Sequence, residues 1–316
     1  MNKFLRRWAL VLTTAAVALA MTLTVPASAR PAKPIKASPE ARFVQAEAQA
    51  MWSTKPVLPP IDVTYAVQES VAGTRWATDS LEAVDAALRL SVGLGSPVAE
   101  DQHVVLAWDA DWAIAQLPDD DEITCLSWIR GAMGGYCGLG YNLAQFEAFA
   151  KSWGYADMNR YETADQALTM AGNIPHEFGH AVQEAAAQVN PSHDLRLVPA
   201  WLREGGPEVF KILAYAESRG IPYTRARGSY GGLNPRCRSI PLSQLSGTGT
   251  TSSYCEYDKG MLAVEYLIAR TGRLSAPFDF FRATGSTTAE IFRDAYGLDL
   301  ADFLKKANAY ANRQMR

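Results

Sequence analysis

Two of the chain's four histidines lie four residues apart in the segment His176-Glu177-Phe178-Gly179-His180. Side chains four residues apart on an α-helix lie on the same face. Two imidazoles placed in this way can bind one Zn²⁺, and the glutamate beside the first can orient a water and accept its proton. The segment therefore predicts a zinc site that hydrolyses peptide bonds, with His176 and His180 as ligands and Glu177 as general base.

The third ligand must come from further along the chain, because a catalytic zinc usually takes three protein ligands and leaves one position for water. A third histidine six residues after the second is excluded, since Ala186 stands there. His193 is one candidate. Glu204 is the stronger candidate, because it lies in the segment Trp-Leu-Arg-Glu-Gly on the next expected helix.

This arrangement resembles the gluzincin metallopeptidases, the superfamily of thermolysin and the zinc aminopeptidases. The resemblance is carried by HEFGH and by a glutamate in Trp-Leu-x-Glu-Gly that follows 24 residues later. It implies that Glu204 is the third zinc ligand. It also implies that Glu208 accepts a hydrogen bond from the other ring N–H of a zinc histidine and so orients that ring. The chain departs from the family at Pro207, where a small residue is usual. A proline there predicts a kink after Glu204 or a helix that begins later.

A donor opposite the metal is also expected, because peptide hydrolysis builds negative charge on the carbonyl oxygen. The segment Tyr257-Asp258-Lys259-Gly260 resembles the Tyr-x-Lys-Gly segment of the gluzincin aminopeptidases, whose tyrosine makes this hydrogen bond. The resemblance implies that Tyr257 is the catalytic donor, with Tyr254 in reserve and His193 as a competitor. Tyr257 could instead only pack its ring at the start of a helix.

The N-terminus reads as a secretory signal over residues 1–29, with a basic start, an apolar run and an Ala-x-Ala cleavage site. An uncleaved anchor is the alternative, but we expect cleavage, a secreted or cell-envelope protein, and no stable membrane insertion afterwards. Losing Lys3, Arg6 and Arg7 with the signal changes the formal net charge from −3 to −6. Such an acidic surface, without a basic stripe, predicts no nucleic-acid partner.

An even number of cysteines in an exported chain predicts disulfides. Three pairings of the four cysteines are possible, and we favour the two local ones, Cys125–Cys137 and Cys237–Cys255.

The order of elements predicts an α+β, zincin-like fold. Residues 30–60 read as a leader or linker, in which residues 39–52 can form a helix. Residues 61–316 read as the metallopeptidase domain, with a small mixed sheet and the active-site helix over 61–190 and a helical part over 191–316. Strands are expected at 61–67, 103–108, 122–130 and 135–141. Helices are expected at 79–92, 143–153, 163–188, 199–219, 256–271, 287–296 and 300–313.

The sequence thus predicts a secreted zinc peptidase that acts on peptide or protein substrates. The alternative is a non-catalytic, zinc-stabilised envelope or binding protein that retains the fold. Glu177 counts against this alternative, because a purely structural zinc needs no base and is normally closed by a fourth protein ligand. A hydrolase of other amide bonds, such as those of cell walls, is a third possibility.

Overall fold

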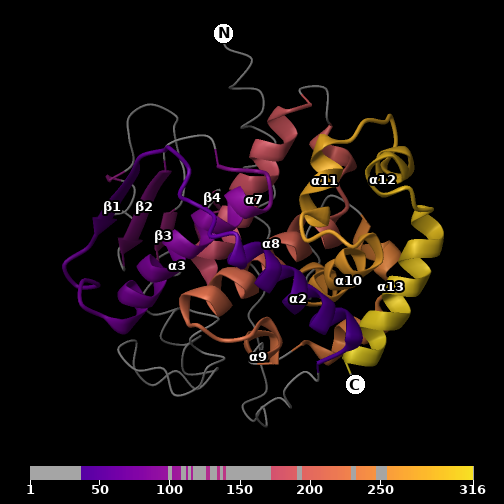
Figure 1. The fold of residues 1–316 in the computed structure, drawn as a ribbon, viewed down its shortest axis with the longest axis horizontal. Helices are drawn as coiled ribbons and strands as arrows, with labels where there is room; N and C mark the ends of the chain where they lie inside the picture. The colour runs from indigo at the N-terminus through magenta and orange to yellow at the C-terminus, as the bar shows by residue number, and fades with distance from the viewer. Residues whose placement is uncertain are drawn as a thin grey trace.

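The computed structural model shows a small sheet at one side of a larger helical body (Figure 1). It describes residues 37–98, 102–107, 112, 115–116, 126–128, 134–135, 138–139, 172–190, 194–228, 233–246 and 255–315. Within these ranges, no helix has the length and apolar character needed to cross a bilayer.

The sheet contains three strands in the order β1 (Val63–Val67), β2 (Gln102–Ala107) and β3 (Leu126–Trp128). Both pairings are parallel, with Val63 opposite Gln102 and Val105 opposite Leu126. Helix α3 (Arg75–Gly93) connects β1 to β2, as parallel neighbours require a crossover. The expected α+β class therefore holds in its coarse form, whereas the described part of this sheet is parallel rather than mixed.

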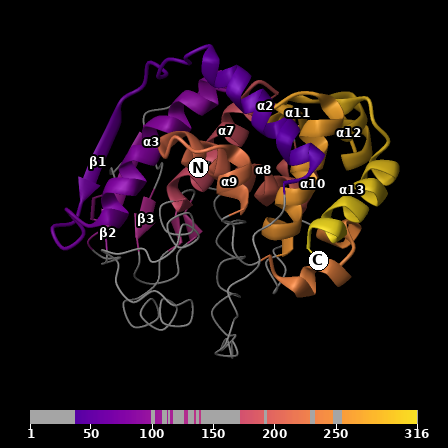
Figure 2. The same cartoon turned by 60° about the horizontal axis from the view of Figure 1, so that its bottom comes forward.

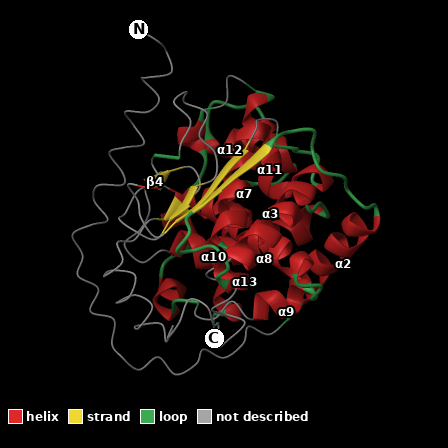
Figure 3. Cartoon of the chain, turned by 90° about the vertical axis from the view of Figure 1, so that its left-hand side faces the viewer, coloured by secondary structure: helices red, strands yellow, loops and turns green. Residues whose placement is uncertain are grey.

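A separate antiparallel pair joins β4 (Gly134–Gly135) to β5 (Gly138–Leu139). Figure 3 shows the strands beside α3 and α7, so the sheet is next to the helix that carries HEFGH. Of the strands expected over 122–130 and 135–141, residues 126–128, 135 and 138–139 are strand, and the rest lie outside the described residues. The helix expected at 143–153 lies outside them.

Three helices form the centre of the molecule: α7 (Asn173–Gln188), α8 (Ala200–Ser218) and α10 (Cys255–Thr271). Helix α8 packs against α7 on one side and α10 on the other, and it also contacts α3. Its first turn is anchored by Trp201 and Leu202, which are fully buried. Of the helix expected over 163–188, the part before residue 172 lies outside the described residues.

Glycines allow these three helices to approach closely. A Cβ at Gly179 of α7 would lie 2.7 Å from Cα of Pro207, and a Cβ at Gly205 would lie 2.2 Å from the carbonyl carbon of Gly260 in α10. Helix α8 begins at Ala200 and continues through Pro207 to Ser218. The prediction that Pro207 starts a later helix is therefore wrong, and the proline ring is accommodated because Gly179 has no side chain.

Helix α2 (Pro39–Ser53) lies across α9 (Tyr223–Gly228) and α10, as Figure 2 shows. Ser38 caps its N-terminus, with its Oγ accepting from the amide of Ala41, and Val44 is fully buried. Residues 39–53 are thus part of the folded body. A linker over 30–60 was expected, but the apolar face of α2 is buried against the other helices.

The C-terminal part contains α11 (Ala276–Arg282), α12 (Thr288–Tyr296) and α13 (Leu300–Gln314). Short 3₁₀ helices occur at η2 (Leu195–Leu197), η3 (Pro235–Ser239) and η4 (Leu242–Ser246). The disulfide Cys237–Cys255 joins η3 to the first residue of α10, as predicted. Cys125 and Cys137 lie outside the described residues, so their predicted bond does as well.

Candidate metal centre

His176 and His180 lie on the same face of α7, with ring centroids 5.0 Å apart. Glu204 of α8 faces both rings, since its Oε2 lies 3.8 Å from Nε2 of His176 and 3.4 Å from Nε2 of His180. One ligand atom from each of the three residues lies within 4.8 Å of the other two. Two imidazoles and a carboxylate converging in this way can hold a metal ion.

The side chains of His176 and Glu204 are buried and that of His180 is partly buried, so their charges interact strongly. His176 and Glu204 are each 6% exposed. Burial opposes ionisation of Glu204, but its contacts with both histidines outweigh burial and lower the pKa of this carboxyl well below its usual range. Burial likewise lowers the pKa of His176, but its contacts with Glu204 and Glu208 outweigh burial and raise that pKa to about 9. The two carboxylates therefore favour positive charge on or beside the histidines.

Glu208 contacts Nδ1 of His176, and the resemblance implies a contact of this kind. Its Oε1 lies 2.7 Å from Nδ1 of His176 and accepts from Nζ of Lys211 at 2.9 Å. Burial disfavours the carboxylate, but the charges of Lys211 and His176 outweigh it and keep the pKa of Glu208 far below its usual range. With Nδ1 this close to Glu208, His176 presents Nε2 to the metal position.

A different residue contacts Nδ1 of His180. Gln183 Oε1 lies 3.0 Å from Nδ1 of His180, and Gln183 Nε2 donates to the backbone carbonyl of Arg203 at 2.9 Å. The Arg203 side chain donates from Nε to Oε1 of Glu204 at 3.0 Å. Sequence reasoning missed Gln183, Arg203 and Lys211. The only sequence signal for them was their closeness to a candidate site residue on the same helix: Gln183 to His180, Arg203 to Glu204 and Lys211 to Glu208.

Glu177 and Tyr257 flank the three candidate ligands. Burial raises the pKa of Glu177, while the charges of His176 and His180 partly oppose that rise. The ring of Tyr257, on the first turn of α10, stacks on that of His176 at 5.7 Å between centroids. Burial, and then the charge of Glu204, raise the pKa of Tyr257 well above its usual value. Tyr257 therefore keeps its proton near neutral pH and can donate a hydrogen bond.

The remaining sequence candidates lie outside the described residues. These are His193, the alternative ligand or donor, and Tyr254, the reserve donor. Among the residues that the structure describes, Glu204 is the one brought to the two histidines as a third candidate ligand.

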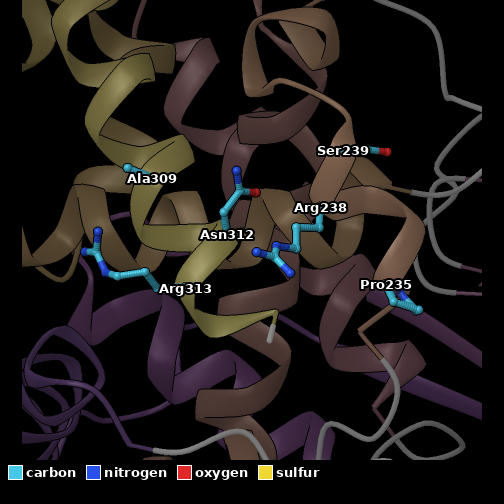
Figure 4. Close-up of a pocket in the computed structure, with 6 residues that line it drawn as sticks. All are labelled: Pro235, Arg238, Ser239, Ala309, Asn312 and Arg313. Atoms are coloured by element: carbon cyan, nitrogen blue, oxygen red, sulfur yellow. The ribbon is translucent and has the colours of Figure 1, made fainter.

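A separate hollow of about 650 Å³ lies between η3 and the end of α13. Figure 4 shows the side chain of Arg238 extending from η3 toward Asn312 on α13. The hollow shares no residue with the metal centre, and its lining is Pro235, Arg238, Ser239, Ala309, Asn312 and Arg313.

The chain was compared with protein-family models, with curated proteins and with solved structures, and none of the three comparisons finds a match.

Proposed function

We propose that this protein is a zinc-dependent peptidase of the gluzincin kind, with a zincin-like fold. The observation that carries the proposal is the convergence of one ligand atom from each of His176, His180 and Glu204 within 4.8 Å, with Oε2 of Glu204 facing Nε2 of both histidines. These donors fit zinc, which prefers imidazole nitrogen and carboxylate oxygen in a tetrahedral arrangement. When bound, zinc would supply Lewis-acid polarisation and a lowered pKa of water.

In this proposal the chain's own residues perform the proton transfers. Glu177 takes a proton from the attacking water and later gives it to the leaving amine. The raised pKa of Glu177 suits a group that must both accept and release a proton near neutral pH. Tyr257 donates a hydrogen bond from its hydroxyl group to the carbonyl oxygen as negative charge develops there.

The supporting carboxylate also favours catalysis over a purely structural metal. Glu208 contacts His176 and is itself neutralised by Lys211, so in this proposal Glu208 is the supporting carboxylate and Glu177 has the separate role of the base. We place the mature enzyme outside the cell, because the N-terminus reads as an export signal. The disulfide Cys237–Cys255 supports this placement.

The proposal is tested on purified mature protein beside Glu177→Gln, with Glu217→Gln on α8 as the matched control. We expect one equivalent of zinc in all three proteins and cleavage of an unfolded protein substrate by the wild type and the control. Glu177→Gln should lose at least about 10²-fold in rate, because its amide cannot accept the proton. Cleavage by Glu177→Gln at the wild-type rate would contradict the mechanism.

A second variant tests the third ligand. Glu204→Ala should lose zinc, because two histidines alone bind it weakly. Metal content by mass spectrometry and affinity by chelator competition measure the loss. If Glu204→Ala binds zinc as tightly as the wild type, the third ligand lies elsewhere. Zinc in the wild type without cleavage of any of several unfolded proteins would favour the non-catalytic alternative.

A further inference from the structure

Pro207 leaves one carbonyl of α8 without its usual donor. In an α-helix, the carbonyl of residue i accepts from the amide of residue i+4. Pro207 lies inside α8 and has no amide hydrogen, so the carbonyl of Arg203 cannot be satisfied in this way. A buried carbonyl needs another donor, because an unpaired one costs free energy.

Gln183 of α7 supplies that donor from the neighbouring helix. Its Nε2 donates to the carbonyl of Arg203 at 2.9 Å, and the residue is only 4% exposed. Gly206 makes room for the amide, since a Cβ at this position would lie 3.2 Å from Gln183 Nε2. Gly179 makes room for Pro207 in the same way. Helices α7 and α8 therefore pack closely around this one hydrogen bond.

This contact fixes the orientation of the Gln183 amide. A carbonyl can only accept, so the NH₂ group of Gln183 must face Arg203, and Oε1 must face the other way. Oε1 lies 3.0 Å from Nδ1 of His180 and can likewise only accept. His180 must therefore carry a hydrogen on Nδ1, and Nε2, which faces Oε2 of Glu204 at 3.4 Å, is the nitrogen on the side of the metal position.

We propose that Pro207 and Gln183 together set the tautomer of His180. Pro207 frees the carbonyl of Arg203, that carbonyl orients the amide of Gln183, and the amide holds the hydrogen on Nδ1 of His180. Both are positioning residues, because neither faces the metal position. The proposal rests on the proposed metal site, but the tautomer itself can be measured without zinc or catalysis.

Nitrogen-15 NMR of the imidazoles tests the tautomer directly, since the chain has only four histidines and His180→Ala assigns the signal. The zinc-free protein is measured at about pH 9, above the usual pKa of imidazole. We expect His180 to carry a hydrogen on Nδ1, whether or not Nε2 is also protonated beside Glu204. Observation of a hydrogen on Nε2 alone in the wild type would overturn the proposal.

Two variants separate positioning from folding. Gln183→Leu removes both contacts, and we expect His180 to populate both tautomers and zinc affinity to fall about 10- to 100-fold. Pro207→Ala restores an amide that competes for the carbonyl of Arg203, while alanine favours the helix. We expect His180 again to populate both tautomers and zinc affinity to fall about tenfold. Circular dichroism should show no loss of helix.

The matched controls are Gln188→Leu at the exposed end of α7 and Pro222→Ala at an exposed site before α9. Both should retain the wild-type tautomer and zinc affinity. If Pro207→Ala is folded with His180 and zinc affinity unchanged, Pro207 has no such role, and the same result in Gln183→Leu refutes the whole proposal. If the wild type binds no zinc, the proposed function fails, while the zinc-free NMR signal still decides the tautomer.

Discussion

The two histidines of the candidate metal centre are held by groups of different charge. Glu208 faces Nδ1 of His176 and carries a negative charge, which Lys211 balances. The neutral amide of Gln183 faces Nδ1 of His180. A carboxylate makes an imidazole a more basic ligand than an amide does. We therefore expect His176 to be the stronger electron donor of the two toward a bound metal.

Tyr257 gives a prediction that separates transition-state stabilisation from metal binding. Tyr257→Phe retains the ring that stacks on His176 but removes the hydroxyl. We expect kcat to fall about 10²- to 10³-fold with a small change in KM, because the lost hydrogen bond acts mainly on the developing oxyanion. Steady-state kinetics on a fluorogenic peptide measures this, and zinc content should stay at one equivalent.

An unchanged kcat in Tyr257→Phe would show that the tyrosine only packs its ring. Tyr266→Phe on the same helix is the matched control, since its ring stacks on Tyr310 rather than on His176. It should leave kcat and zinc content as they are in the wild type.

Among the elements, the α8–α10 contact has the least room for change. A Cβ at Gly205 would lie 2.2 Å from the carbonyl carbon of Gly260, and a Cβ at Gly260 would lie 2.5 Å from the carbonyl oxygen of Trp201. Backbone atoms cannot move aside as a flexible side chain can. This contact therefore sets the distance between Glu204 on α8 and Tyr257 on α10.

Gly205→Ala should therefore separate α8 from α10. We expect a loss of about 1–3 kcal/mol in the free energy of unfolding, as for other overpacked interiors, measured by urea titration. Activity should fall by more than zinc affinity does, because Tyr257 moves relative to the metal while all three ligands remain. Glu217→Ala on the same helix should stay within about 0.5 kcal/mol of the wild type. Equal stability of Gly205→Ala and the wild type would refute the tight contact.

The elements also show how far sequence reasoning reaches. Helices at 199–219 and 256–271 were expected and occur as Ala200–Ser218 and Cys255–Thr271, because their helical patterns are long. Of the strand expected over 122–130, Leu126–Trp128 is observed, and the other residues lie outside the described part of the chain. The role of Gln183 could not be predicted from its spacing to His180 alone, because it depends on how α7 crosses α8 at Pro207.

At the scale of the whole molecule, one buried polar cluster joins four helices. Arg227 of α9 and Glu265 of α10 form an ion pair with both side chains fully buried, at 2.6 Å between Nε and Oε1. Tyr223 donates to the same carboxylate oxygen at 3.0 Å. Tyr310 of α13 donates to the other oxygen, and its hydroxyl lies 2.8 Å from Oγ of Ser38 at the start of α2.

Arg227→Leu should be strongly destabilising, because it leaves the charge of Glu265 buried without its cation. Breaking such a pair costs about 3–5 kcal/mol in the free energy of unfolding. Chemical denaturation measures the loss, and Arg225→Leu at an exposed site on the same helix is the control. If Arg227→Leu unfolds at the wild-type denaturant concentration, the cluster contributes nothing to stability.

The contact between Ser38 and Tyr310 spans 272 residues of sequence. An emerging chain can form α7 and α8 and bring the metal ligands together long before α13 has been made. Helix α2, by contrast, has no complete docking site until α13 arrives, because its capping serine contacts that last helix. Contacts of such long sequence separation form late and slowly. The first helix of the described fold should therefore be among the last to settle, and its amide hydrogens should be among the last to gain protection in a refolding experiment.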